Sequence, residues 1–176
     1  MKILIAYASR HGSTKSCVER LAQALNNADV TCVNLEEAQV DPTAFDTVVF
    51  GSSVRFGKLL PSANAFLKTY RDILMQKTLA LFLSCGYAHE YEYYLEKLFP
   101  AQLRDASIST LYFGGSLRKD GLSFLEKIVV RSMRSSIFEN DIDNGEYTPT
   151  LPSILPENVD KMATVIREKL KNAKKI

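Results

Sequence analysis

Three short segments rich in glycine and serine contain the residues best suited to binding chemistry. Each follows an apolar run typical of a buried strand. The segments are Ser9-Arg10-His11-Gly12-Ser13-Thr14, Gly51-Ser52-Ser53-Val54-Arg55-Phe56-Gly57 and Ser84-Cys85-Gly86-Tyr87-Ala88-His89. Ligands of open parallel sheets bind beyond the carboxyl ends of the strands, so these three segments are the predicted site.

The first segment has the composition of a phosphate-binding loop. Its hydroxyl groups can donate hydrogen bonds, Gly12 allows close backbone approach, and the segment leads into a predicted helix whose N-terminus supplies free N–H groups. A monophosphate would fit there. The alternative is that Ser13 or Thr14 only caps the helix, which is a common role of serine and threonine. This segment alone leaves both interpretations open.

Several other functional patterns are missing from the sequence. Neither G-x-x-x-x-G-K-[ST] nor a G-x-G-x-x-G after a strand occurs, which makes ATP and NAD less favoured as principal ligands. The absence of G-x-S-x-G gives an acyl-transfer hydrolase little support. Cys17, Cys32 and Cys85 are far apart and form no C-x-x-C pair, so we predict neither a disulfide framework nor a metal site. Such cysteine usage favours the reducing cytoplasm.

Length and composition indicate one globular domain spanning residues 1–176. A chain of 176 residues can bury a sizeable core without disulfides or metals. No stretch is long and apolar enough to cross a bilayer, and the short apolar run at the N-terminus is interpreted as a strand rather than a signal peptide. The net charge of +2 is too weak to indicate nucleic acid as the main partner.

Apolar runs alternate with segments of helical spacing, which predicts an α/β fold with a mostly parallel sheet. Several runs are continuous rather than alternating, as expected for strands covered by helices on both faces. Strands are predicted at Lys2–Tyr7, Val30–Leu35, Thr47–Gly51, Thr78–Ser84 and Ser107–Phe113. Helices are predicted at about Ser13–Asn26 and Ser62–Gln76, around Tyr91–Leu98, and from Pro156 onward.

Residues 114–155 are less regular and are predicted to form an insertion before the last helix. Within it, Leu122–Met133 is predicted to be helix-like, and the segment Arg118–Arg134 around it has a basic amphipathic pattern. Such a helix could make peripheral contact with a membrane surface. It could equally cover the sheet and expose a solvated basic face.

The first strand and the three loops together resemble the flavodoxin family, in which a hydroxyl-rich loop after the first strand holds the phosphate of FMN. Ser9, Gly12, Ser13 and Thr14 match that loop, and His11 departs from it. The resemblance implies FMN as the cofactor and a three-layer sandwich around a five-stranded parallel sheet of order 2-1-3-4-5. It also implies that the second and third loops flank the flavin ring, with Phe56 and Tyr87 as their aromatic residues. The implied cofactor-binding residues are Ser9, Arg10, His11, Gly12, Ser13, Thr14, Ser52, Ser53, Val54, Arg55, Phe56, Gly57, Ser84, Cys85, Gly86 and Tyr87.

Within that family, the chain most resembles the flavodoxin-type menaquinone-dependent protoporphyrinogen dehydrogenases. The similarity is carried by the run Gly51-Ser52-Ser53-Val54-Arg55-Phe56-Gly57 and by Gly114-Gly115-Ser116-Leu117-Arg118 after the fifth strand. It implies an FMN-dependent oxidoreductase that passes electrons from a reduced small molecule to a quinone or a protein redox partner, at the inner face of a bacterial membrane. The alternative is an electron carrier without its own substrate, but carriers of this family have acidic surfaces and this chain has a net charge of +2.

Overall fold

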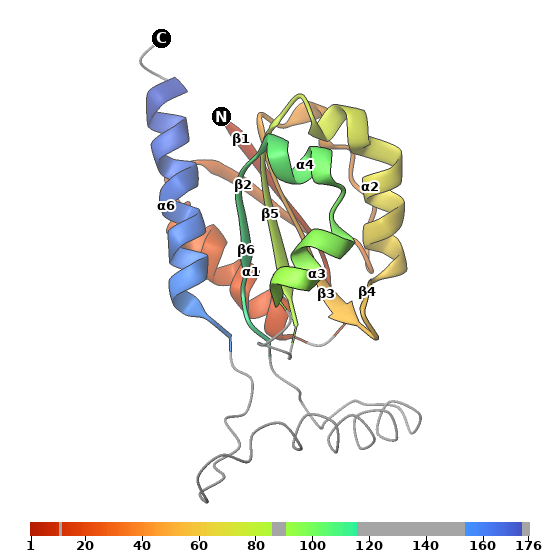
Figure 1. Cartoon of the computed structure of the whole chain (residues 1–176). Coiled ribbons are helices and arrows are strands. Elements are labelled where there is room, and N and C mark those ends of the chain that lie inside the picture. The colour runs from red at the N-terminus through yellow and green to blue at the C-terminus, as the bar shows by residue number, and fades with distance from the viewer. Residues whose placement is uncertain (11, 86–90, 116–153, 174–176) are drawn as a thin grey trace, which may run out of the picture.

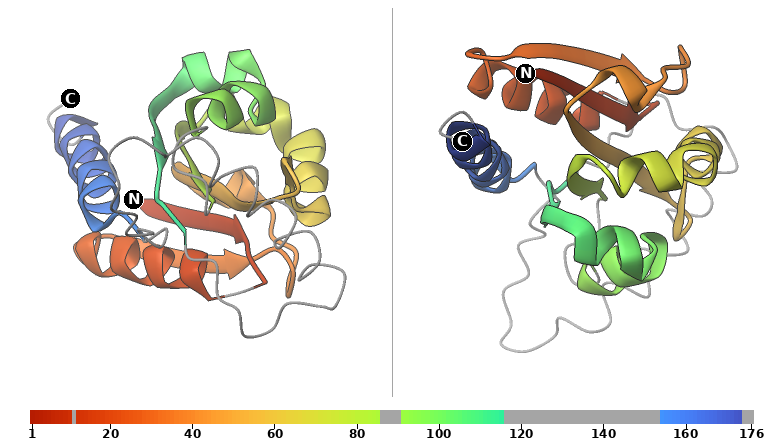
Figure 2. Two further views of the ribbon diagram at one scale, coloured as in Figure 1. Left: turned by 60° about the horizontal axis from the view of Figure 1, so that its bottom comes forward. Right: turned by 90° about the horizontal axis from the view of Figure 1, so that it is seen from above.

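In the described residues, helices connect most of the successive strands (Figure 1). A computed structural model describes residues 1–10, 12–85, 91–115 and 154–173. Within these ranges the predicted α/β class is confirmed, and helices cover both faces of a central sheet (Figure 2). No helix in the described ranges has the length and apolar character needed to cross a bilayer.

Five parallel strands form the sheet in the order β2-β1-β3-β5-β6, and a short sixth strand, β4, pairs antiparallel with β3. Without β4, this is the predicted order 2-1-3-4-5. The strands are β1 (Lys2–Ala8), β2 (Asp29–Asn34), β3 (Thr47–Arg55), β4 (Lys58–Leu59), β5 (Thr78–Ser84) and β6 (Ser107–Tyr112).

Helices α1 (Ser13–Ala24) and α6 (Pro156–Ala173) pack on one face of the sheet. The opposite face is covered by α2 (Pro61–Leu74), α3 (Tyr91–Leu98) and α4 (Ala101–Ala106). The views in Figures 1 and 2 show these three layers. Helix α4 and the short 3-10 helix η1 (Pro42–Ala44) were not predicted, because three to six residues are too few for a hydrophobic period to be recognised.

The continuous apolar runs arise because both faces of the sheet are buried. In β1, Ile3 and Ile5 face the cluster formed with α1 and α6, while Leu4 and Ala6 face the cluster formed with α2 and α4. Successive side chains of a strand point to opposite faces, so a strand buried on both sides needs apolar residues at every position. The same alternation holds in β5, where Leu81 and Phe82 belong to different clusters.

The structure corrects the predicted end of the third strand. Residues Ser52, Ser53, Val54 and Arg55, which the sequence placed in a loop, belong to β3. Ser52 and Ser53 continue the pairing with β5, and Val54 and Arg55 pair with Leu59 and Lys58 of β4. These pairings satisfy backbone N–H and C=O groups that a loop would leave to water, which explains why the strand continues beyond its apolar part.

Most of the predicted insertion, including the amphipathic segment Arg118–Arg134, lies outside the described residues. The two ends of the predicted insertion meet. Gly114 and Ile154 form an antiparallel bridge, and the N–H of Leu155 donates to the carbonyl of Phe113 at 2.9 Å. The last helix therefore starts beside the carboxyl end of β6.

Candidate functional site

The carboxyl ends of β1, β3 and β5 lie side by side, and we call this the carboxyl edge. Ala8 of β1 pairs with Ser52 of β3, and Ser53 pairs with Ser84 of β5. Helix α1 follows β1 onto one face, whereas α2 follows β3 and β4 onto the other. The strand order therefore reverses between β1 and β3, which is the position where open α/β sheets bind ligands.

The loop after β1 leads into an uncapped helix. Gly12 is the N-cap residue of α1, has a φ of 62°, and makes no side-chain capping bond because it has no side chain. Ser13 and Thr14 are the first residues inside the helix, so the interpretation that one of them is the cap is wrong. The first turn also contains no acidic residue. Free N–H groups and the positive end of the helix dipole are thus available to an anion.

Thr14 contributes a buried hydroxyl group to this helix start. Its side chain is fully buried, with 0% exposure, and Oγ1 has no hydrogen-bond partner in the part of the chain that the structure describes. Leaving such a group unpaired costs about 1–3 kcal/mol. A phosphate oxygen would accept this hydrogen bond. The residues present at the start of α1 therefore fit a phosphate monoester. His11 lies outside the described residues.

The second predicted loop is the tip of the β3–β4 hairpin. Phe56 and Gly57 connect the two strands, and both have positive φ values, 49° and 69°. Two-residue hairpins with this backbone favour Asn-Gly, and a bulky residue is strained in the left-handed region. The Phe56 side chain is 58% exposed, so it is not part of the core. A strained, exposed aromatic residue at the carboxyl edge is a candidate ligand contact.

The serine hydroxyls of β3 and β5 form hydrogen bonds with backbone groups near the strand ends. Ser52 Oγ donates to the carbonyl of Ser53 at 2.9 Å and accepts from the N–H of Leu60 at 3.4 Å. Ser53 Oγ donates to the carbonyl of Ala8 at 3.4 Å. Ser84 Oγ donates to the carbonyl of Gly114 at 2.8 Å. These hydroxyls have structural partners, and their predicted contact with a cofactor stays a prediction.

The start of the loop after β5 is fixed by aromatic and backbone contacts. The N–H of Cys85 donates to the carbonyl of Gly114 at 3.0 Å, and the hydroxyl of Tyr112 donates to the carbonyl of Cys85. Burial raises the pKa of Tyr112, so its hydroxyl stays protonated and keeps donating. Tyr91 stacks on Tyr112 with ring centroids 5.1 Å apart. Gly86 and Tyr87 lie outside the described residues.

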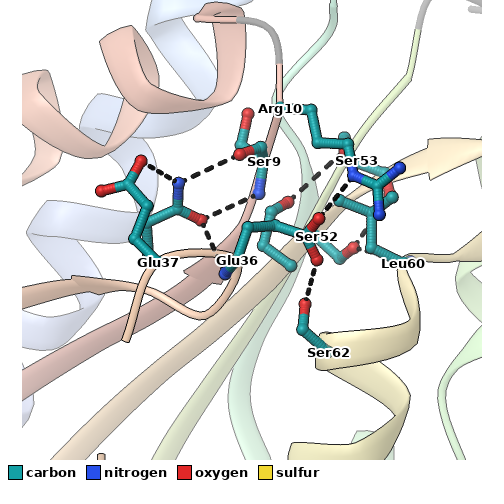
Figure 3. A network of polar contacts seen from close by, with 10 residues as sticks. Ser9, Arg10, Glu36, Glu37, Ser52, Ser53, Leu60 and Ser62 are labelled. Carbon is teal, nitrogen blue, oxygen red and sulfur yellow. Dashed lines mark hydrogen bonds and ion pairs between the residues drawn. The ribbon is translucent and has the colours of Figure 1, made fainter. Parts of the chain in front are cut away.

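A group of polar residues after β2 was not predicted to belong to the site. Figure 3 shows Arg10 reaching toward Glu36, with Nε to Oε2 at 2.5 Å, and Ser62 Oγ donating to Glu36 Oε1 at 2.5 Å. Burial raises the pKa of Glu36, but the Ser62 hydrogen bond and the Arg10 guanidinium outweigh it and leave that pKa below its usual value. Because β2 lies beside β1, residues that follow β2 meet the loop that follows β1.

The chain is an α/β protein with a doubly wound sheet and a candidate phosphate-binding site at the carboxyl edge, made of the uncapped start of α1, the unpaired hydroxyl of Thr14 and the strained hairpin tip. The family model described as a flavodoxin domain matches residues 4–141. The chain belongs to the flavodoxin domain family. No curated protein sequence matches the chain significantly.

Solved flavodoxin structures share the fold, two of them over nearly the whole chain. A short-chain flavodoxin associated with a non-canonical PDU bacterial microcompartment has a TM-score of 0.56 at 14% identity, covering 96% of this chain and 98% of that one. The Fusobacterium nucleatum flavodoxin bound to flavin mononucleotide has a TM-score of 0.55 at 14% identity, with the same coverage. Two-electron reduced Megasphaera elsdenii flavodoxin has a TM-score of 0.52 at 22% identity, covering 68% and 90%. At these identities the likeness shows the fold.

Proposed function

We propose that this protein binds FMN at the carboxyl edge and transfers electrons through it. The unpaired, buried hydroxyl of Thr14 at the uncapped start of α1 is the observation that carries this proposal. This hydroxyl has no hydrogen-bond partner among the described residues, and a phosphate oxygen would accept its hydrogen bond. FMN is the phosphate ester that the structurally similar Fusobacterium nucleatum flavodoxin binds. When bound, FMN supplies a ring that accepts and releases one or two electrons.

The chain's own residues then have separate tasks. The first turn of α1, with Ser13 and Thr14, holds the phosphate through N–H groups and hydroxyls. The exposed ring of Phe56 at the hairpin tip would offer an aromatic surface to the flavin ring. The start of the loop after β5, which the resemblance to the flavodoxin family implies would also contact the ring, is held in place by the hydrogen bond from Tyr112 to the carbonyl of Cys85. The protein therefore provides the anchor and the ring orientation, while the redox chemistry is that of the cofactor.

The finer proposal is an oxidoreductase of the protoporphyrinogen dehydrogenase type. A reduced small molecule donates electrons, and a quinone or a protein redox partner accepts them. This rests on the similarity of the run from Gly51 to Gly57 and on the net charge of +2, which does not match the acidic surface of a simple shuttle. Such a protein would work in the cytoplasm, in peripheral contact with the membrane where quinones are found.

The second candidate is an electron carrier without a substrate of its own. It is supported by the flavodoxins that share the fold over nearly the full length of both chains. A carrier needs only a reachable flavin and a docking surface, because the partner proteins provide the substrates.

A turnover assay distinguishes the two candidates. The FMN-loaded protein is mixed with protoporphyrinogen and a soluble quinone, and the oxidation rate is compared with that of free FMN at the same concentration. We expect turnover at least about tenfold above free FMN, since a bound donor reacts at high effective concentration. A rate equal to that of free FMN, with fast electron exchange to a haem protein, would favour the carrier.

A further inference from the structure

The side-chain amide of Asn34, the last residue of β2, makes four hydrogen bonds. Oδ1 accepts from the N–H of Ser9 at 3.2 Å and from the N–H of Glu36 at 3.3 Å. Nδ2 donates to the carbonyl of Ser9 at 3.0 Å and to Glu37 Oε1 at 2.8 Å. An amide has two N–H groups and an oxygen with two lone pairs, so this side chain uses its full hydrogen-bonding capacity.

The two bonds to Ser9 hold the first residue of the phosphate loop from both sides. Ser9 follows β1 directly and is only 6% exposed. A single side chain thus pairs with its N–H and with its carbonyl, which fixes the peptide units on either side of it. The next residue, Arg10, is held by Glu36 from the same turn, and Glu36 is itself 16% exposed and bonded to Ser62 (Figure 3). The end of β2 therefore determines how the phosphate loop leaves β1.

We infer that Asn34 is a positioning residue for the phosphate of the cofactor. This inference rests on the proposed FMN site. Asn34 does not touch the phosphate; it acts through Ser9, by holding the loop in the conformation that leads to the free N–H groups of α1. A preorganised loop loses little conformational entropy when its ligand binds, so the ligand binds more tightly. The effect must be larger for FMN than for riboflavin, because riboflavin has the same ring and no phosphate.

Substitution of Asn34 by aspartate removes the donors and leaves the shape almost unchanged. The new carboxylate still accepts from the N–H groups of Ser9 and Glu36. It cannot donate to the carbonyl of Ser9, and it faces the carboxylate of Glu37. The hydrogen bond to the carbonyl of Ser9 is thereby lost, and the carboxylate oxygen that replaces the donor repels the carbonyl oxygen.

The test compares the dissociation constants of FMN and riboflavin, measured by quenching of flavin fluorescence, for the wild type and Asn34→Asp. We expect the FMN constant to rise about tenfold or more, and the riboflavin constant to stay within roughly twofold. Asn26→Asp is the matched control. Asn26 is exposed beyond the end of α1, so the same change of charge there leaves both constants unchanged.

A second variant, Asn34→Ala, separates lost hydrogen bonds from added charge and serves if the aspartate variant does not fold. It is expected to weaken FMN binding selectively as well, by a smaller factor. Equal losses for FMN and riboflavin, or an unchanged FMN constant in a folded variant, would overturn the role of Asn34. If instead the wild type binds neither flavin, or binds both equally, the proposed phosphate site itself is wrong.

Discussion

Replacing Gly51 by alanine is expected to destabilise the fold by about 3 kcal/mol. A Cβ atom at this position in β3 would lie 2.3 Å from the ring of Phe82, far inside van der Waals contact. Phe82 is fully buried and stacks on Phe113 with ring centroids 4.4 Å apart, so its ring has no room to move. The measurement is the free energy of unfolding from urea denaturation.

Two further variants identify the cause of this loss. Gly57→Ala places a Cβ only 3.6 Å from Tyr94, an ordinary contact, but at a φ of 69°. It should cost about 1 kcal/mol through backbone strain alone. Adding Phe82→Leu to Gly51→Ala should restore part of the stability, because the smaller side chain makes space for the methyl group. A Gly51→Ala variant as stable as the wild type would show that the packing of Phe82 over β3 is misassigned.

Replacing Phe56 by asparagine is expected to raise stability and to weaken flavin binding at the same time. Asparagine accepts the left-handed conformation at the hairpin tip, which should stabilise the fold by about 1 kcal/mol. Loss of the exposed aromatic ring should weaken FMN binding by about two- to tenfold, since aromatic stacking contributes about 0.5–1.5 kcal/mol. Thermal unfolding and FMN titration of the same preparation measure the two effects.

Phe56→Leu is the control for this pair of effects. It removes the ring but keeps a bulky residue at a φ of 49°, so FMN affinity should fall without a gain in stability. If Phe56→Asn binds FMN as tightly as the wild type, the ring does not contact the flavin. If Phe56→Asn is more stable and binds FMN more weakly than the wild type, the backbone strain at Phe56 is kept because its ring is needed for binding.

The sheet could be predicted because its signal is local. Runs such as Leu79 to Leu83 are apolar at every position, which is the pattern of a strand buried on both faces. The strand order followed from the resemblance to the flavodoxin family, and the structure has that order. The start of α1 directly after the first hydroxyl-rich segment could also be predicted, while the contact of that segment with a phosphate stays a prediction.

The hairpin formed by the end of β3 and by β4 could not be predicted from the same signals. Its residues from Ser52 to Arg55 include polar side chains that are typical of loops, and its turn uses a phenylalanine where asparagine is favoured. Pairing with β4 and β5 decides the conformation there, and such tertiary contacts override local propensity.

Asn34 and Glu36 were missed for a different reason. Asn34 is the last residue of β2 and Glu36 follows it, whereas the three predicted loops follow the first, third and fourth predicted strands. Nothing in the local sequence shows that an asparagine at the end of a strand will bond both peptide units around Ser9, 25 positions earlier. Only the pairing of β1 with β2 brings these residues together.

The most direct test of the FMN site is a titration of the wild type and of Thr14→Val with FMN and with riboflavin. Valine has the shape of threonine without its hydroxyl. The wild type should retain a visible flavin spectrum after removal of free FMN and should bind FMN about 100-fold more tightly than riboflavin, as a few hydrogen bonds to a charged phosphate would give. Thr14→Val should lose about tenfold in FMN affinity alone. No retained flavin, or equal affinities for the two flavins in the wild type, would contradict the proposed site.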